Sequence, residues 1–384
     1  MSTDKRALSQ IGGPIRTEGE ADALGAAWEA ASREEPDTLT HGFHPWPARM
    51  HPAIARVILE RSGAPALVDP FCGAGTTLIE ARVRGARSFG VDLSPLAIRL
   101  ARVKASVPSR ASRVAFLEAA EALAAASEAR VRGRVPMTVE LPPPLRARWD
   151  MHVLKELGGL REELRALDAP EPLREALTLV FSSILTKVGR QRSETEEQLA
   201  PRRIRKGLAT EIFLRKAVEL ERRWAALAEV ARGPAPELVE GDARRLPELL
   251  GQRRAPLILT SPPYGGTYDY ATHHAHRMAW LGLDDRALRR GELGARRHAG
   301  APDARARWDR DVVAMLRAMA AALEPSGAIV LVMGDALLGG EQVPVPAQLA
   351  RLAPAAGLVV HGVASQARHG GRDEHLIRLR LGAR

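Results

Sequence analysis

Residues 66–77 read ALVDPFCGAGTT, a short apolar run that ends at an acidic residue and a glycine-rich turn. A helical pattern follows over 76–84, and a second apolar run at 88–91 ends at Asp92 before another helical pattern over 95–104. Strands that alternate with helices of this length predict a parallel sheet with right-handed crossovers. The stretch therefore predicts an α/β fold of the Rossmann type.

The rest of the chain extends this pattern and interrupts it once. Over about 107–233 the apolar residues follow a helical period, and strand signals return at 237–239, 257–260 and 328–333. Apolar runs at 358–363 and 376–379 predict a final antiparallel pair. We therefore predict a mostly parallel sheet with an antiparallel final strand, in a domain formed by residues 41–106 and 234–384. A helical insertion, 107–233, divides this domain, and residues 1–40 are expected to be a flexible tail or a loosely packed helix.

Composition limits the partners and the compartment. The 384 residues include one cysteine, Cys72, which excludes an intramolecular disulfide and a cysteine-rich zinc site. The net charge of +10 favours a polyanionic partner, although an arginine- and alanine-rich composition is also typical of GC-rich genomes. Because the chain lacks an apolar stretch of about 18 residues and its beginning is polar, we expect a cytoplasmic protein without membrane contact.

The glycine-rich turn predicts a ligand site. Gly73 and Gly75 allow the backbone to approach a ligand at the carboxyl end of a strand, where doubly wound sheets bind ligands. The turn is neither a phosphate-binding Walker loop nor a complete dinucleotide motif, since Ile79 replaces the third glycine. Asp92 is positioned to accept from ribose hydroxyls, and Asp242 from an adenine amino group. The alternative is that both aspartates cap helices.

A second motif follows the apolar strand at 257–260 and reads Ser261, Pro262, Pro263 and Tyr264. Two prolines end strand pairing, so the Ser261 hydroxyl and the Pro262 carbonyl are expected at the sheet edge as acceptors for an amino group. Such hydrogen bonds would align the lone pair of a poorly nucleophilic base nitrogen with a methyl donor. Tyr264 would stack on a base flipped out of a duplex.

The three tyrosines of the chain, at 264, 268 and 270, all lie in or near this motif. We predict that Tyr268 and Tyr270 contact the substrate; the alternative is an aromatic cluster that stabilises a turn. His273, His274 and His276 follow directly, but the sequence has no clear arrangement for a catalytic metal. These histidines are expected to contact phosphate or to pack.

Together the two motifs resemble those of the DNA amino-methyltransferase family that forms N4-methylcytosine or N6-methyladenine. Residues 69–77 are similar to its cofactor motif D-P-F-x-G-x-G-T-T, and residues 261–264 to its catalytic S/D-P-P-Y/F motif. The resemblance covers about 43–105 and 237–335 and implies a class I methyltransferase fold with S-adenosylmethionine as cofactor. It implies that Asp69, Phe71, Gly73, Gly75 and Thr76 contact the cofactor and that Asp92 binds its ribose. Residues 44–52 resemble the segment near the methionine end.

The resemblance also suggests the target base. Serine at the first catalytic position is more typical of cytosine-N4 enzymes, and aspartate of adenine-N6 enzymes. Many cytosine-N4 enzymes, however, place the catalytic motif before the cofactor motif, whereas this chain has the reverse order. The insertion then falls where target-recognition segments can lie. Its basic run Arg202, Arg203, Arg205 and Lys206 is a candidate for phosphate and base contacts, with a solvated helical face as the alternative.

We therefore predict a DNA cytosine-N4 methyltransferase of the kind found in restriction–modification systems. Adenine-N6 methylation remains the nearest alternative. RNA methyltransferases, including those acting on guanine N2, usually carry D-P-P-Y, and protein-glutamine methyltransferases carry asparagine before the prolines. A nucleic-acid-binding protein that has lost catalysis would tolerate decay of both motifs. Cytosine-C5 chemistry is excluded because Cys72 lies in the cofactor loop rather than in the catalytic loop.

Overall fold

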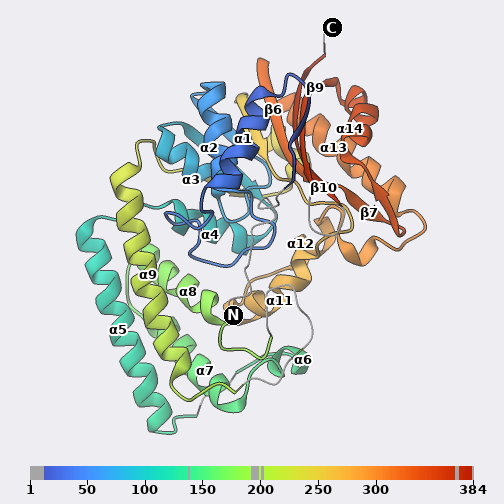
Figure 1. The fold of residues 1–384 in the computed structure, drawn as a ribbon. Coiled ribbons are helices and arrows are strands. Elements are labelled where there is room, and N and C mark those ends of the chain that lie inside the picture. The colour runs from blue at the N-terminus through green and yellow to red at the C-terminus, as the bar shows by residue number, and fades with distance from the viewer. Residues whose placement is uncertain (1–12, 137–138, 192–198, 200–202, 368–371, 383–384) are drawn as a thin grey trace.

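A computed structural model describes residues 13–136, 139–191, 199, 203–367 and 372–382. Within these residues eight strands form one sheet in the order β1-β9-β10-β6-β5-β2-β3-β4 (Figure 1). Its strands are β1 (Arg16–Gly19), β2 (Ala66–Asp69), β3 (Arg87–Asp92), β4 (Glu237–Glu240), β5 (Ala255–Thr260), β6 (Leu323–Gly334), β9 (Leu358–Ala367) and β10 (Asp373–Leu381). A separate hairpin pairs β7 (Ala336–Leu338) with β8 (Glu341–Val343).

The five strands from β4 to β6 run parallel, and β10, β9 and β1 continue the sheet antiparallel. The predicted mostly parallel α/β sheet with an antiparallel end is confirmed. From β2 the chain moves outward to β3 on one side, and β5 later pairs on the other side of β2. This reversal of strand order opens a crevice at the carboxyl ends of β2 and β5, where both sequence motifs begin.

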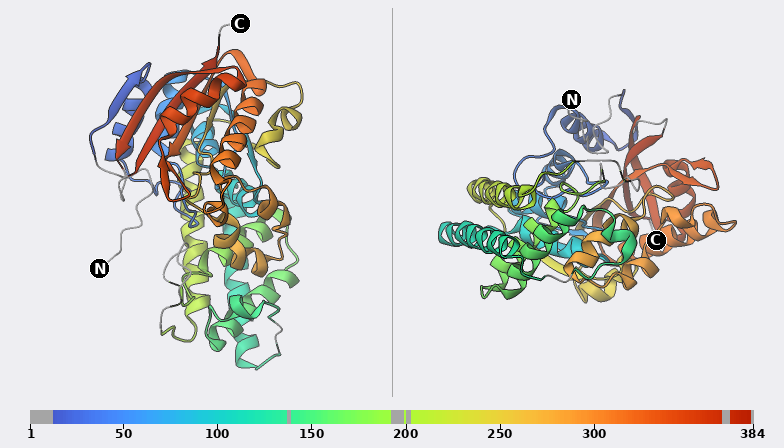
Figure 2. Two further views of the ribbon diagram at one scale, coloured as in Figure 1. Left: turned by 90° about the vertical axis from the view of Figure 1, so that its right-hand side faces the viewer. Right: turned by 90° about the horizontal axis from the view of Figure 1, so that it is seen from below.

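Helices cover both faces of the sheet (Figures 1 and 2). One face buries apolar side chains of α1 to α4, and the other buries those of α10, α13 and α14. The helices of the α/β part are α1 (Asp22–Arg33), α2 (Pro52–Ser62), α3 (Thr76–Arg84), α4 (Pro95–Ala105), α10 (Leu246–Leu250), α11 (Tyr270–Leu281), α12 (Arg286–Gly291), α13 (Ala304–Ala322) and α14 (Val345–Leu352), with 3₁₀ turns η1 (Ala243–Arg245), η2 (Arg296–His298) and η3 (Ala353–Ala356). Among the described residues no helix has the length and apolar character needed to cross a bilayer.

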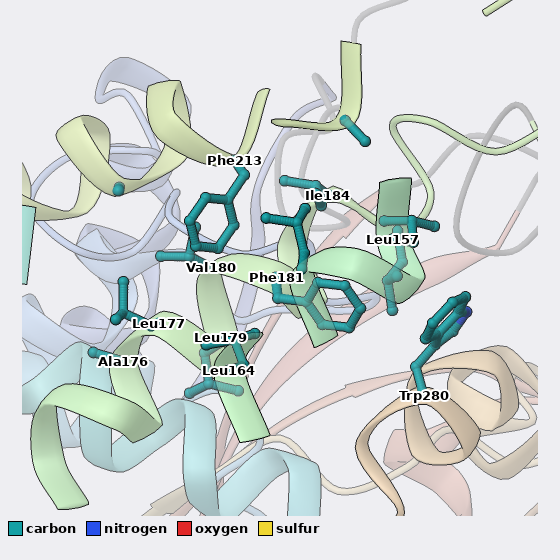
Figure 3. Packing of buried hydrophobic residues seen from close by; sticks show 14 of the residues in the cluster. Leu157, Leu164, Ala176, Leu177, Leu179, Val180, Phe181, Ile184, Phe213 and Trp280 are labelled. Atoms are coloured by element: carbon teal, nitrogen blue, oxygen red, sulfur yellow. The ribbon is translucent and has the colours of Figure 1, made fainter. Parts of the chain in front are cut away.

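The segment between α4 and β4 is helical, as predicted. It consists of α5 (Arg110–Arg132), α6 (Pro143–Arg146), α7 (Met151–Ala166), α8 (Glu171–Ile184) and α9 (Leu208–Val230). Figure 3 shows Phe181 of α8 near Trp280 of α11, and their rings lie 5.6 Å apart, edge to face. Because this apolar cluster also includes Leu96 and Leu100 of α4, the helical segment packs directly on the α/β part.

The N-terminal region differs from the expectation of a flexible tail or loosely packed helix. β1 pairs with β9, and α1 packs against α2 with Leu24, Ala27 and Trp28 buried. Trp28 donates its indole N–H to the Ala364 carbonyl at 3.0 Å. The few apolar residues of this region lie on one face of α1, so a low apolar content still supplies a well-packed helix.

Candidate cofactor and catalytic site

A pocket at the carboxyl ends of β2 and β5, here called the central pocket, brings the two motifs together. Most of the residues predicted to contact a cofactor line it, and so do two residues of the catalytic motif. These are Asp69, Phe71, Gly73, Thr76, Asp92 and Asp242, together with Ser261 and Pro263. Residues about 190 positions apart in the sequence thus share one cavity.

The two glycines of the cofactor motif meet different steric requirements. Gly73 has φ +48°, and a Cβ atom there would lie 2.9 Å from Nε1 of Trp46. Gly75, with φ +86°, does not line the central pocket, and its Cβ would lie 3.0 Å from Ala101 of α4. The predicted cofactor contact therefore suits Gly73, whereas Gly75 turns the chain into α3 and lets α3 approach α4.

Asp92 has the geometry expected of a ribose acceptor. Its Oδ2 accepts from the Gly73 N–H at 2.9 Å, and its Oδ1 accepts from the Ser94 N–H at 2.8 Å. Each carboxylate oxygen keeps a second lone pair. Within the described residues no cation pairs with Asp92. The carboxylate thus fits neutral hydroxyl donors, and burial raises its pKa to about 6.

This pKa predicts a pH dependence of cofactor affinity. Below about pH 6 the Asp92 carboxyl gains a proton and loses acceptor capacity, whereas hydroxyl donors in the complex favour the ionised form. We expect the dissociation constant of S-adenosylmethionine to be constant from pH 7 to 8 and to rise toward about tenfold per unit below pH 6. Calorimetric titration measures it. Asp92→Asn should bind weakly without this dependence; if it titrates like the wild type, the dependence belongs to another group.

Asp242 follows β4 and also lines the central pocket. Burial raises the pKa of its carboxyl, but hydrogen bonds from Arg244 outweigh this effect and hold the pKa below its ordinary value. Arg244 Nη2 lies 2.6 Å from Asp242 Oδ2, and its Nη1 lies 3.4 Å from Asp311 Oδ1. Asp242 also accepts from the Arg244 N–H at 2.9 Å and thereby caps η1. Asp242 thus caps a helical turn, as the alternative expected, and also lines the pocket.

Asp69 connects the two motifs. Its buried carboxylate accepts from Thr77 Oγ1–H at 2.5 Å, from Thr260 Oγ1–H at 2.5 Å and from the Phe71 N–H at 3.1 Å. Thr77 belongs to α3, and Thr260 is the residue directly before Ser261. Burial raises the pKa of Asp69 to about 6, while these three hydrogen bonds oppose the rise. Asp69 therefore sets the position of the catalytic motif relative to the cofactor motif.

The catalytic motif is only partly directed into the pocket. Ser261 and Pro263 line it, whereas Pro262 and Tyr264 are buried and do not. Tyr264 is 3% exposed, packs in the core beneath the sheet edge and donates its hydroxyl to Glu374 Oε1 at 2.5 Å. The prediction that Tyr264 presents a stacking face to a base is therefore wrong for this conformation, because β10 supplies a buried acceptor for its hydroxyl.

Other aromatic side chains reach the pocket instead. Tyr270 and Trp46 line it, and Trp46 stacks on the buried His274 with ring centroids 4.5 Å apart. Tyr268 lies behind Tyr270 at 5.7 Å and does not line the pocket. Trp46 was not singled out from the sequence, although it belongs to residues 44–52, the stretch that resembles the segment near the methionine end.

The neighbouring histidines pack, as one of the two expectations had it. His273, His274 and His276 are buried on α11. Burial, and then the charge of Arg277, hold the pKa of His274 and His276 well below the ordinary value, so both rings are neutral. Within the described residues no group of histidine, cysteine and carboxylate side chains could hold a metal.

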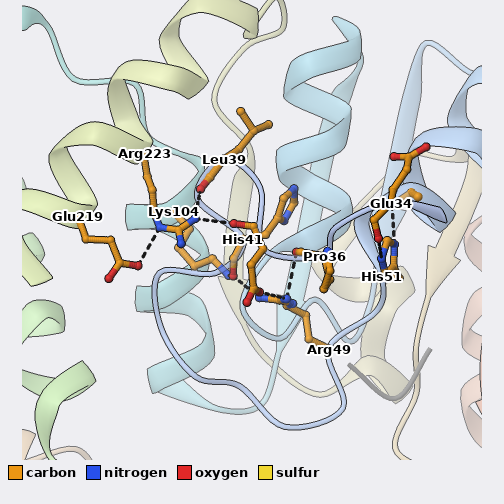
Figure 4. Close-up of polar contacts among 11 residues, drawn as sticks. Glu34, Pro36, Leu39, His41, Arg49, His51, Lys104, Glu219 and Arg223 are labelled. Atoms are coloured by element: carbon orange, nitrogen blue, oxygen red, sulfur yellow. Dashed lines mark hydrogen bonds and ion pairs between the residues drawn. The ribbon is translucent and has the colours of Figure 1, made fainter. Parts of the chain in front are cut away.

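Cations hold the loop that carries Trp46 (Figure 4). Lys216 of α9 donates to the Phe43 carbonyl at 2.5 Å, and Lys104 of α4 donates to the His41 carbonyl at 3.1 Å. Arg223, two turns after Lys216, donates to the Asp37 and Leu39 carbonyls at 2.6 Å each. The helical segment therefore fixes one wall of the central pocket through side-chain to backbone hydrogen bonds.

We expect Lys216→Met to loosen this wall. The variant keeps an apolar stem but leaves the Phe43 carbonyl without this donor, which costs about 1–3 kcal/mol while the carbonyl stays buried. Glu219 is partly exposed and keeps its second donor, Arg223, at 2.8 Å. Thermal unfolding should shift downward, and the dissociation constant of S-adenosylmethionine should rise about tenfold. Lys206→Met, on an exposed lysine, is the control. If stability falls and cofactor affinity does not change, Lys216 has no influence on the pocket.

The basic run of the helical segment does not line the central pocket. Arg203, Arg205 and Lys206 are exposed before α9, and Arg205 pairs with Glu211. Arg202 lies outside the described residues. A role for this run in substrate binding remains a prediction.

Sequence comparisons identify one part of the chain. Residues 43–137 match the model of the RMKL-like methyltransferase domain. The type II methyltransferase M.MjaII of Methanocaldococcus jannaschii is 34% identical over 80 residues, which are 20% of this chain and 15% of that protein. The type II methyltransferase M.MvaI of Kocuria varians is 35% identical over 82 residues, 20% of this chain and 18% of its own length. The similarity thus spans less than a fifth of either relative.

Solved structures are similar only at a distance. TrmN from Thermus thermophilus has 14% identity and a TM-score of 0.34, over 86% of this chain and 49% of its own. The rRNA methyltransferase AviRa from Streptomyces viridochromogenes has 15% identity and a TM-score of 0.31, over 94% of this chain and 92% of its own. Similarity at this level carries no information about the substrate. The matched domain model and the pocket geometry support a methyltransferase domain with S-adenosylmethionine as cofactor.

Proposed function

We propose that the protein transfers a methyl group from S-adenosylmethionine to an exocyclic amino group of a DNA base, with cytosine N4 as the target. The observation that carries this proposal is the central pocket, where Ser261 and Pro263 lie in one cavity with Asp92 and the cofactor motif. Bound S-adenosylmethionine would supply an electrophilic methyl group. Asp92 would hold its ribose and Asp242 its adenine.

The chemistry assigned to the catalytic motif is alignment. Ser261 Oγ has one described partner, the Tyr264 hydroxyl at 3.5 Å, so its acceptor capacity remains for a ligand in the pocket. An amino N–H that donates to Ser261 is drawn toward tetrahedral geometry, with its lone pair directed at the methyl donor. Pro262, whose carbonyl was the second acceptor expected from the sequence, is buried and does not line the pocket, so the alignment is assigned to Ser261. As the new nitrogen–carbon bond forms, the bond between the methyl carbon and the sulfonium sulfur would break, with its electron pair left on the sulfur of the departing S-adenosylhomocysteine. The nitrogen would release one proton to solvent. Tyr264 would act indirectly, by holding the motif to Glu374.

The choice of DNA rests on the two type II methyltransferases that resemble residues of this chain and on the positive net charge. The choice of cytosine rests on the serine of the catalytic motif. Residues 107–233 are proposed as the target-recognition region because Lys216 and Arg223 hold the loop that leads to Trp46 and because the segment carries the basic run 202–206.

The test is a methylation assay with labelled S-adenosylmethionine, offered separately with duplex DNA and total RNA. Nucleosides of any labelled polymer are then identified by mass spectrometry. We expect N4-methylcytosine in DNA. N6-methyladenine would correct the base, and label in RNA alone would correct the polymer. Absence of label from both, with cofactor bound, would overturn the proposal.

Ser261→Ala is a better inactive variant for this assay than Tyr264→Ala. Tyr264→Ala would remove a buried ring and its hydrogen bond to Glu374, so loss of activity could reflect unfolding. Ser261→Ala removes only one hydroxyl, from a side chain that is partly exposed. Ser62→Ala, the same exchange at an exposed position at the end of α2, is the matched control and should retain full activity.

A further inference from the structure

A second cavity, here called the side cavity, adjoins the central pocket. It shares Gly291 and Glu292 with that pocket and has a volume of about 230 Å³. Its walls come from the end of α12, from η2 and from the start of α13, which follow the catalytic motif in the chain. The shared residue Gly291 lies beside Asp242, since a Cβ atom there would be 3.8 Å from Asp242 Oδ2. Another lining residue, Gly294, accepts from the Gly266 N–H at 2.8 Å, so the cavity also borders the segment that directly follows the catalytic motif.

The cavity lies in an unusually basic segment. Residues 286–310 contain eight arginines and three carboxylates. Arg290 of α12, His298 of η2 and Arg307 of α13 line the side cavity, and all three side chains are exposed. Three elements thus direct basic side chains toward one space.

The acidic residues of the cavity already have partners. Glu292 Oε2 lies 2.6 Å from Arg297 Nη1, and Asp311 pairs with Arg244 at 3.4 Å. Within the described residues Arg290 forms no ion pair. Arg307 is 3.5 Å from Asp303, and both are about half exposed, so this pair is weak and screened. Arg244 and Arg297 are each shared with a second carboxylate, Asp242 and Asp269 respectively, so they add no free positive charge. The positive charge open to a ligand is that of Arg290 and Arg307.

We propose that the side cavity is a phosphate subsite, in which Arg290 and Arg307 contact the nucleic-acid backbone next to the target base. This inference rests on the proposed function and deepens it. A flipped nucleotide needs its flanking phosphates fixed while its base occupies the catalytic pocket. Guanidinium groups suit this task because their planar donors match phosphate oxygens. An interface placed here differs from the basic run 202–206, the sequence-based candidate.

The experiment measures binding rather than methylation. The affinity of the full chain for a fluorescent 30-base-pair duplex is followed by anisotropy from about 50 to 300 mM KCl. For the double variant Arg290→Ala/Arg307→Ala we expect affinity to fall about 10- to 100-fold. The slope of log affinity against log salt should become shallower by about 1.8, which corresponds to two phosphate contacts. Cofactor affinity should be unchanged, and Arg290→Lys/Arg307→Lys should retain most of the slope.

The control is Arg61→Ala/Arg87→Ala, which removes two exposed arginines, one near the end of α2 and one at the start of β3, away from the carboxyl ends of the parallel strands. If the cavity variant keeps the wild-type slope, or if the control changes it equally, the subsite is overturned. If the wild type binds RNA but not duplex DNA, and the slope changes only in the cavity variant, the subsite holds and the polymer of the proposed function is wrong. Binding only to an acidic protein, or to neither nucleic acid, overturns the inference.

Discussion

Ser261→Ala should lower kcat for methyl transfer by about 100- to 1000-fold, the range found when one positioned hydrogen-bonding group is removed from an active site. Ser261 lies at the end of β5 and lines the pocket that Asp92 also lines. Its hydroxyl would accept from the amino group most strongly when the nitrogen becomes tetrahedral, so its loss affects the transition state more than the bound substrate. Single-turnover kinetics measures the effect, with the unmethylated form of the polymer that the methylation assay identifies as the substrate.

Two readouts separate this role from a structural one. The affinity for S-adenosylmethionine and the unfolding temperature should match those of the wild type, because Ser261 forms one long hydrogen bond, 3.5 Å to Tyr264. Ser261→Asp, which keeps an acceptor, should recover part of kcat. A variant in which KM rises and kcat stays the same would show that Ser261 only contacts the substrate and does not align its nitrogen.

The fold was largely predictable because it depends on local patterns. Proline positions mark the starts of α2 and α4, and short apolar runs that end at Asp69 and Asp92 give β2 and β3. The order of parallel strands then follows from crossover rules. β1 was missed because its pairing with β9 joins segments more than 300 residues apart, and no local pattern contains that contact. A helix in this region was one of the two expectations, but its close packing was not expected.

The site residues that belong to a sequence motif were predictable. Those whose orientation depends on tertiary packing were less so. Asp92 and Ser261 lie in the central pocket as their motifs indicate. Tyr264 was expected to stack on a flipped base, but Glu374 of β10, 110 residues later, offers its hydroxyl a buried acceptor. Trp46 lines the pocket, and lysines of α4 and α9 donate to backbone carbonyls of the loop that leads to it. Hydrogen bonds to backbone atoms leave no pattern in the sequence.

The second large effect is expected for Asp69→Ala, which should destabilise the protein and abolish cofactor binding. The substitution leaves the buried hydroxyls of Thr77 and Thr260 without their acceptor, at a cost of about 1–3 kcal/mol for each. A loss of this size is a large fraction of the stability of a typical domain. Because Asp69 joins α3 to the residue before Ser261, both motifs should lose their relative position. Chemical denaturation and calorimetric cofactor titration measure the two effects.

Asp69→Asn keeps the shape of the side chain but removes its ionisation, so it separates the effect of the carboxylate charge from the effect of packing. The pKa of Asp69 is raised to about 6 from an ordinary value of 3.8, so between these values the folded protein binds a proton that the unfolded chain does not. The contribution of Asp69 to stability is therefore greatest below about pH 4 and is lost as pH rises through 6. From pH 7.5 to pH 5 the wild type should gain about 1 kcal/mol relative to Asp69→Asn. Parallel curves for the two proteins would show that Asp69 does not titrate in this range and that only its hydrogen bonds to the two threonines matter.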